Sequence, residues 1–302
     1  MVYARIVNAS LPDKARGFFS RLSAAEASAG RRCAIKTITS IIKNALAEDA
    51  GSGDITTRLF IAQDKMIQAR IIAKENFLLC GINVTQEVFR RVDPSLKFKQ
   101  KIIEGSQVKK DSVLAVISGK ASSILIAERV ALNLLSLLCA VATKTKKFVK
   151  AAAPYKIKIF DTRKTIPGLR VLEKYAVRMG GGYNHRFSLD EMILLKDNHL
   201  KINAGIVQLP KASKKYKIEI ETQNLDEFKR ALSLKPDIIM LDNMSIKDIK
   251  QAVKLNKSCL LEASGGINLS NIKKYAATGV KIISIGELTA SIESVNISLE
   301  VA

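Results

Sequence analysis

The sequence has no tryptophan, and its aromatic residues amount to only 5%. Aromatic rings are the platforms on which single-stranded nucleic acids stack their bases, so this scarcity argues against nucleic-acid binding. The formal net charge of +21 still requires an explanation. Composition alone leaves open nucleic-acid binding, binding to an anionic membrane surface, small polyanionic substrates and a general bias toward lysine. Because the lysines are scattered along the chain, we expect no nucleic-acid partner.

Cysteine is also scarce, and its spacing excludes two kinds of site. No two cysteines form a C-x-x-C pair, which argues against a disulfide framework and against the usual zinc spacings. We expect reduced, mostly buried thiols in a cytoplasmic protein. The cysteines are Cys33, Cys80, Cys139 and Cys259.

Long hydrophobic runs are absent as well. The longest apolar stretch, 130–142, is short for a membrane span and is broken by Asn133 and Ser136. Residues 1–35 are basic and rich in Ser and Ala, but they lack the continuous apolar segment of a secretory signal. We therefore predict no membrane segment and a poorly defined N-terminal extension over residues 1–35.

From Tyr155 onward, short β-branched runs alternate with helix-like segments, which is typical of a parallel sheet. Ser245 and Ser270 are the predicted N-caps of two of these helices, and the second helix is expected to stop at Gly279. The predicted strands are 156–160, 192–195, 217–220, 237–241, 259–261 and 280–285.

Polar or glycine residues follow every one of these predicted strands. In a β/α barrel all strand carboxyl ends converge on one rim, where the active site is built. An open, doubly wound sheet would bring together only the strands at its switch point. Six consecutive strands with functional groups at their ends therefore favour a barrel. The groups at the strand ends are Asp161, Arg163, Lys164, Lys196, Glu221, Asp242, Ser264, Gly265, Gly266 and Gly286.

The preceding part of the chain has a different pattern. Predicted strands at 66–74, 77–79, 96–103 and 113–117 surround one predicted helix, 83–92, which indicates a separate α+β domain. A long helical stretch from 124 to 152 then leads toward the barrel. We divide the chain into the extension 1–35, an N-terminal α+β domain 36–127, a catalytic α/β barrel 128–289, and a C-terminal tail 290–302 that packs back on the N-terminal domain.

Basic residues are concentrated between 161 and 199. The planar fork of arginine binds carboxylates and phosphates through two hydrogen bonds, which lysine cannot do. Arg163, Lys164 and Arg186 lie in irregular sequence near strand ends, which favours anion binding over structural ion pairing. A spacing near four residues places three other cations on the solvated face of a helix: Arg170, Lys174 and Arg178.

Acidic residues occur close to these cations. Glu219 and Glu221 point the same way on a strand, and Asp242 ends the next strand. Carboxylates in a cationic pocket suit a magnesium ion that is held partly by substrate oxygens. They could also stabilise positive charge on a sugar, or simply pair with lysines for structure.

Glycine-rich turns follow the last two predicted strands. Residues 264–266 read Ser-Gly-Gly, and Gly286 follows the final strand. Backbone N–H groups in such turns form the phosphate site of many barrels. One Ser-Gly-Gly alone is weak evidence, but its place at a strand end favours a phosphate site.

Taken together, these segments resemble the quinolinate phosphoribosyltransferase family, the decarboxylating nicotinate-nucleotide pyrophosphorylases. The resemblance implies an α/β protein with an N-terminal α+β, sandwich-like domain and an incomplete α/β (TIM-like) barrel. It also implies a magnesium requirement and a homodimer or higher oligomer with composite active sites. The similar segments are 48–57, 128–133, 161–170, 180–186, 196–199, 218–221, 241–243 and 262–266.

The reaction implied by the resemblance belongs to NAD biosynthesis. A pentosyltransferase of this family transfers phosphoribosyl from phosphoribosyl pyrophosphate to quinolinate, with loss of carbon dioxide, to give nicotinate mononucleotide and pyrophosphate. The nearest alternative is a phosphoribosyltransferase that uses nicotinate without decarboxylation. Such an enzyme clamps one carboxylate only, so several arginines in one site argue against it.

The resemblance also implies which residues hold quinolinate. Arg129 would reach into the pocket of the neighbouring subunit, although a basic residue on a helix is ordinarily a solvated position. Lys196 would reach the substrate anions deep in the pocket. The residues that would hold the two carboxylates are Arg129, Arg163, Lys164, His185 and Arg186.

The remaining implied roles concern the ribose, the metal and the phosphate. Glu221 and Asp242 would face the ribose and the magnesium pyrophosphate, and with Lys164 and Lys196 they form the predicted catalytic set. This chain departs from the family at Glu287, where a small residue is common. The residues implied for binding the 5′-phosphate are Ser264, Gly265, Gly266 and Gly286.

Overall fold

The computed structural model describes residues 28–202 and 208–302, and these pack into two compact units. Unit 1 comprises the described residues up to Thr143 together with Pro167–Met179 and Ile292–Ala302. Unit 2 comprises Lys144–Ile166 and Gly180–Ser291. Helix α6, Ala121–Ala152, runs without a break through residue 127, the expected domain boundary, and through Thr143, where the two units divide.

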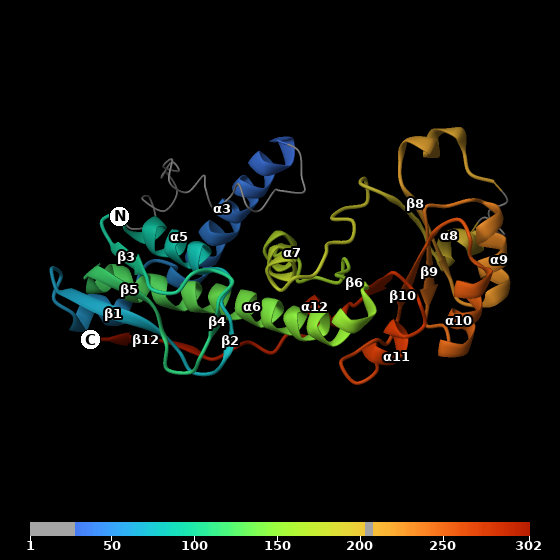
Figure 1. Ribbon diagram of the computed structural model, residues 1–302. Coiled ribbons are helices and arrows are strands. Elements are labelled where there is room, and N and C mark those ends of the chain that lie inside the picture. Colours follow the sequence, from blue (N-terminus) through green and yellow to red (C-terminus); the bar gives the residue numbers. More distant parts are fainter. Residues whose placement is uncertain (1–27, 203–207) are drawn as a thin grey trace. The chain divides into compact units, whose positions relative to one another are not determined.

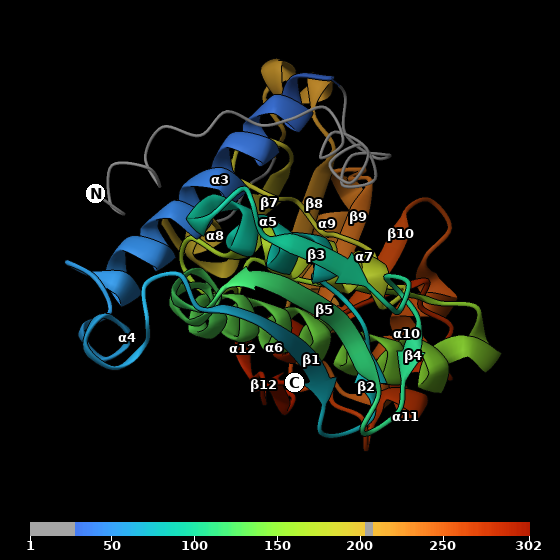
Figure 2. The ribbon, with the colours of Figure 1, turned by 90° about the vertical axis from the view of Figure 1, so that its left-hand side faces the viewer.

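Unit 1 is built around an antiparallel sheet with the strand order β12-β1-β5-β3. Figure 2 shows β1, β5 and β3 side by side. β12, from the C-terminal end of the chain, pairs with β1 from Ala69↔Val301 to Ala73↔Ile297. A separate short pair joins β2 and β4. The strands are β1 Met66–Ala73, β2 Phe77–Leu78, β3 Lys97–Gln100, β4 Gln107–Val108, β5 Val113–Lys120 and β12 Ile297–Val301.

The helices of unit 1 contribute to its core together with the strands. The first part of α6, the long green helix of Figure 1, buries Leu135, Leu138 and Val141 completely. Among the described helices, α6 alone is long and apolar enough to cross a membrane, but 61% of its most apolar window is buried inside the structure. The helices that precede it are α3 Ser28–Ala50, α4 Ile55–Phe60 and α5 Ile82–Val92.

Helix α7, Arg170–Met179, corrects one prediction. Lys174 is 1% exposed, so its assignment to a solvated face is wrong. Arg178, one turn later, is exposed as expected. Within unit 1, α7 packs against α3, and Tyr175 donates a hydrogen bond to Glu104 at 3.0 Å. Neighbouring elements therefore cover a helix face that the residue spacing alone assigns to solvent.

Unit 2 contains six parallel strands in the order β6-β11-β10-β9-β8-β7. In the described residues β6 and β7 do not pair with each other, so the sheet stays open between them and the barrel is incomplete, as predicted. All six strands fall within or next to predicted segments. They are β6 Lys158–Phe160, β7 Ile193–Leu195, β8 Ile218–Thr222, β9 Ile238–Asp242, β10 Leu260–Ser264 and β11 Ile282–Ser284.

The helices between these strands test two predicted caps. Ser245 Oγ accepts a hydrogen bond from the N–H of Asp248, which confirms it as the N-cap of α10. The predicted cap at Ser270 is wrong, because Asn271 occupies that position and Asn268 accepts the hydrogen bonds of this turn. The helices of unit 2 are the last part of α6, α8 Asp197–Ile202, α9 Leu225–Ser233, α10 Ile246–Leu255, α11 Ile272–Ala276 and α12 Glu287–Ala290, with short 3-10 helices at Ala153–Tyr155 and Lys211–Lys215.

Candidate active site

A cavity of about 750 Å³ lies in unit 2 at the carboxyl ends of the strands. Every one of the six strands contributes lining residues from its carboxyl end or the following turn, as expected for a barrel rim. The chemically capable lining residues are Thr162, Arg163, Lys164, His185, Arg186, Lys196, Glu221, Asp242, Asn243, Ser264, Gly265, Gly266, Ser284, Gly286 and Glu287. The structure therefore brings together all of the predicted site residues except Arg129.

Two arginines give the cavity its strongest anion-binding feature. Arg163 follows β6, and Arg186 lies in the irregular segment between α7 and β7. Burial lowers the pKa of Arg186, and the nearby positive charge of Arg163 lowers it further. The Nε atoms of both arginines are buried and have no hydrogen-bond partner among the described residues. The two guanidinium groups lie close enough to repel each other, and their Nε–H donors are not used within the described protein. Such a pair favours an anion that carries more than one negative group.

The carboxylates predicted at the rim lie on adjacent strands. Glu221, on β8, accepts a hydrogen bond from Lys196 Nζ at 2.8 Å. Asp242, at the end of β9, accepts one from the side chain of Asn243 at 2.8 Å. Two carboxylates are too few for an all-protein magnesium site, but they are what a magnesium ion carried on substrate phosphates requires. The donor set therefore fits a metal that arrives with its substrate.

Two of the glycines in the predicted phosphate turns lie close against other side chains. Gly265 has φ +90°, and a Cβ there would lie 2.2 Å from Asn243 Oδ1. Any other residue at this position would push Asn243 aside. A Cβ on Gly286 would lie 3.1 Å from Lys164 Cδ, so this glycine keeps the path of Lys164 open. These contacts give a physical reason for glycine at two of the three predicted phosphate glycines, Gly265 and Gly286.

Glu287 places a carboxylate at the same end of the cavity. Its Oε1 lies 3.5 Å from Lys144 Nζ, and the same ammonium donates to the carbonyl of Ser291 at 2.7 Å. Lys144 thus balances the negative charge that this chain carries beside its glycine turns. The pair explains how an acidic residue is tolerated next to a predicted phosphate site.

His185 forms part of the cavity wall, but its ring is engaged within the protein. Its Nδ1 accepts a hydrogen bond from the backbone N–H of Arg186 at 2.8 Å. Its Nε2 lies 2.9 Å from Glu219 Oε2 and 3.8 Å from Glu262 Oε1. Its backbone N–H donates to Asp161 Oδ1 at 2.8 Å. The ring can therefore bind a substrate carboxylate only by giving up one of these bonds.

Glu219 and Glu262 are buried acids behind His185, with exposures of 0% and 1%. Burial raises the pKa of both carboxyl groups to about 8, and repulsion from Glu219 adds to the rise at Glu262. The positive charges of Arg186 and Lys196 act in the opposite direction on Glu219. The cavity thus has a cationic lining backed by buried acids.

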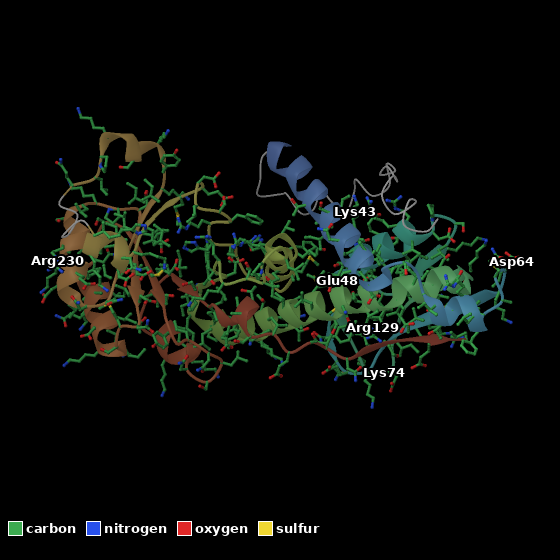
Figure 3. The ribbon with its side chains drawn as sticks, turned by 180° about the vertical axis from the view of Figure 1, so that it is seen from behind. Lys43, Glu48, Asp64, Lys74, Arg129 and Arg230 are labelled. Carbon is green, nitrogen blue, oxygen red and sulfur yellow. The ribbon has the colours of Figure 1, made fainter. Side chains whose placement is uncertain are left out.

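Arg129 lies in unit 1, on α6 (Figure 3). Its side chain is 62% exposed, and its guanidinium lies 3.9 Å from Glu128 of the same helix. It does not line the cavity of unit 2. An exposed arginine with only a weak ion pair remains available to another molecule.

Sequence reasoning did not assign roles to several residues that shape this site. Glu219 was grouped with Glu221 by the two-residue period of a strand, and its contact with His185 bears out that it faces inward. Glu262 carries the same signal, since it lies two residues before Ser264 on β10. Asp161 is among the predicted strand-end groups and Asn243 stands next to Asp242 of the same set, but their hydrogen bonds to His185 N–H and to Asp242 could not be read from the sequence.

Comparisons with known proteins agree with this geometry. Residues 54–139 match the family model described as "Quinolinate phosphoribosyl transferase, N-terminal domain". Residues 141–300 match the model "Quinolinate phosphoribosyl transferase, C-terminal domain". The two matches together cover most of the chain.

Individual relatives span nearly the same length. A Synechocystis protein named "Probable nicotinate-nucleotide pyrophosphorylase [carboxylating]" is 44% identical over 248 residues, covering 79% of this chain and 84% of its own. A solved nicotinate-nucleotide pyrophosphorylase from Francisella tularensis superposes with a TM-score of 0.82 at 38% identity, covering 88% of this chain and 96% of its own. The corresponding structure from Ehrlichia chaffeensis has a TM-score of 0.83 at 38% identity, covering 87% and 98%.

Proposed function

Because the chain belongs to the quinolinate phosphoribosyltransferase family, we propose that its cavity binds quinolinate and phosphoribosyl pyrophosphate together. The enzyme transfers the phosphoribosyl group to quinolinate with decarboxylation, a step of NAD biosynthesis. The observation that carries this assignment is the pair Arg163 and Arg186, whose buried Nε donors have no hydrogen-bond partner in the part of the chain that the structure describes. A pyridine dicarboxylate supplies two adjacent anionic groups for these two cations.

The reaction has two bond-exchange stages. In the first, the bond from the anomeric carbon to pyrophosphate breaks, pyrophosphate takes the electron pair, and the pyridine nitrogen forms the new bond. In the second, the ring carbon beside that nitrogen loses its carboxylate as carbon dioxide. The electron pair left on the ring carbon is stabilised by the neighbouring positive nitrogen and then takes a proton from water.

The protein contributes orientation and electrostatics to both stages. Arg163 and Arg186 hold the carboxylates, and Lys164 and Lys196 add positive charge to the same wall. Glu221 and Asp242 face the positive charge that develops on the ribose. The backbone around Ser264, Gly265, Gly266 and Gly286 receives the 5′-phosphate.

A magnesium requirement is part of the proposal. Glu221 and Asp242 would hold the ion together with oxygens of the pyrophosphate group. When bound, the ion would neutralise part of the charge on the leaving group. Lys196 Nζ, which donates to Glu221 Oε2 at 2.8 Å, also lines the cavity and would contribute its positive charge to binding the substrate anions.

A homodimer with composite sites would give Arg129 a role. Its exposed guanidinium on α6 supports a contact with the cavity of a partner subunit. Mixing inactive Arg129→Ala and Asp242→Ala proteins under conditions of subunit exchange tests this. Mixed dimers would each contain one intact site, so roughly a quarter of wild-type activity should return. No recovery, despite demonstrated exchange, would remove Arg129 from any composite site.

We also propose a cytoplasmic location, supported by the free cysteines Cys80, Cys139 and Cys259.

The activity itself is tested by incubating the protein with quinolinate, phosphoribosyl pyrophosphate and magnesium. We expect nicotinate mononucleotide and carbon dioxide in equal amounts, with nicotinate as a poor replacement for quinolinate. Equal turnover of nicotinate would show that one carboxylate suffices, and the site would then belong to a nicotinate phosphoribosyltransferase.

A further inference from the structure

The donor and the acceptor can be assigned for each hydrogen bond of the His185 ring. Because His185 Nδ1 accepts a hydrogen bond from the N–H of Arg186, the ring proton lies on Nε2. The short Nε2 contact is then a hydrogen bond donated to Glu219 Oε2. Neither ring nitrogen is left for substrate, so the ring connects a strand to the segment that carries Arg186.

We propose that Glu219 is a positioning residue, which sets the place of Arg186 in the quinolinate site by acting through His185. This inference rests on the proposed function. Arg186 has no helix or strand of its own to fix it. Its position depends on its backbone bond to His185 and on the bond from its Nη1 to the carbonyl of Met192 at 2.9 Å. His185 is in turn fixed by Glu219 on β8 and by Asp161 directly after β6.

The burial of Glu219 supports a functional role over a stabilising one. Its Oε1 is buried and has no hydrogen-bond partner among the described residues. A buried carboxyl oxygen without a partner lowers stability, so folding alone gives no reason to keep an acid here. An acceptor for His185 Nε2–H does give one, since an apolar residue of similar size would leave that donor unpaired.

The same cluster could be read as a metal site. Ligand atoms of His185, Glu219 and Glu262 lie within 4.8 Å of one another. The hydrogen-bond distance between His185 and Glu219, together with the bond at Nδ1, favours a hydrogen bond over shared coordination. Elemental analysis of the purified protein separates the two readings, and one bound metal ion per chain in this cluster would overturn the positioning role.

The main test compares Glu219→Leu with Glu219→Gln. The glutamine oxygen can still accept from His185 Nε2–H, whereas leucine cannot. A displacement of about 1 Å of a positioned group can lower a reaction rate on the order of 100-fold. We expect a displaced Arg186 to weaken quinolinate binding by the leucine variant roughly tenfold or more. The glutamine variant should stay near wild type, and the Michaelis constant for phosphoribosyl pyrophosphate should change little in both.

A matched control lies on the same strand. Thr222 is 1% exposed, and its Oγ1 donates to the carbonyl of Met240 at 3.1 Å. Thr222→Val therefore removes a buried hydrogen bond of β8 without touching His185. We expect a lower melting temperature with unchanged quinolinate binding. If Glu219→Leu does not fold, Glu219→Met keeps the comparison, because methionine fills a similar volume and also lacks an acceptor of comparable strength.

Quinolinate binding is measured by calorimetry, which requires no turnover. Wild-type protein that fails to bind quinolinate would contradict the proposed function itself. Wild-type protein that binds it, with a folded leucine or methionine variant that binds equally well, would overturn only the role of Glu219. Equal losses for quinolinate and phosphoribosyl pyrophosphate would do the same, since they indicate general damage to the cavity.

Discussion

Glu104 of unit 1 and Glu262 of unit 2 are carboxyl groups withdrawn from solvent, and their hydrogen-bond partners differ. In unit 1, Glu104 accepts hydrogen bonds from the N–H of Gly81, from the Asn83 side chain at 3.0 Å and from the Tyr175 hydroxyl at 3.0 Å. In unit 2, neither oxygen of Glu262 has a hydrogen bond of good geometry among the described residues, although the Ser284 hydroxyl and His185 Nε2, 3.8 Å from Oε1, lie beside it. Burial raises the pKa of both groups.

The difference separates structural acids from those of a functional site. Glu104 supplies acceptors at the start of α5, where the cap residue Gly81 has no side chain to do so. Glu262 lies with Glu219 behind His185, next to a cavity lined by cations. We infer that Glu104 contributes to the stability of unit 1, whereas Glu219 and Glu262 are kept for the sake of the site in unit 2.

The largest expected effect tests this contrast at Asp242. Asp242→Asn keeps the size of the side chain but removes its charge and replaces one acceptor oxygen by an NH2 donor. Losing one preorganised electrostatic group commonly costs about 2.7–4 kcal/mol of barrier, so turnover should fall roughly 100- to 1000-fold. Thermal unfolding should change little. A variant that keeps its rate and melts earlier would place Asp242 with the structural acids.

A second substitution tests the arginine pair. Arg163→Lys retains the positive charge but loses the planar fork, so two parallel hydrogen bonds to a carboxylate can no longer form. We expect the Michaelis constant for quinolinate to rise about tenfold or more, the equivalent of about 1.4 kcal/mol or more. A near-normal constant for quinolinate would mean that charge alone is sufficient at this position.

At Glu104 the comparison predicts a loss of stability without a loss of activity, the reverse of the outcome at Asp242. Glu104→Leu would leave the donors of Gly81, Asn83 and Tyr175 without their acceptor. Leaving buried donors unpaired costs about 1–3 kcal/mol each, so the free energy of unfolding should drop clearly. Activity per folded molecule should be unchanged. Denaturant unfolding and single-turnover assays on the folded fraction measure the two quantities, and a selective loss of activity would contradict the comparison.

The smallest expected effect is on how the free energy of unfolding changes with pH. Burial raises the pKa of Glu262 from an ordinary value of 4.5 to about 8, so between these values the folded state holds a proton that the unfolded state has released. The free energy of unfolding therefore falls as pH rises through this window, by at most about 1.4 kcal/mol per pH unit for one group. Glu262→Gln should flatten the slope in urea unfolding. Identical slopes in both proteins would show that Glu262 is ionised when folded.

The sequence predicted the fold well because its signals are local. The six barrel strands, the helix at α5 and the cap at Ser245 each follow from a few neighbouring residues. The rim residues were found for the same reason, since a strand end is visible in sequence. Lys174 was assigned to solvent because residue spacing does not show which helix faces a neighbouring element covers.

Side-chain partnerships were the part that could not be read from sequence. His185 resembles a substrate contact, and only the structure shows both of its ring nitrogens engaged. Glu219 is separated from it by 34 residues, and no spacing rule connects a strand residue with an irregular segment that far away. Such contacts depend on how strands are ordered in the sheet, which the sequence leaves open.

The pairing of β1 with β12 has a consequence for how the protein is made. Between these strands in the sequence lies the whole of unit 2, so on the ribosome β1 emerges long before its neighbour exists. Until then one side of β1 is an unpaired edge that could recruit strands from other nascent chains. The same logic applies to a fragment that stops at Thr143, which would carry this edge permanently and should be prone to aggregation.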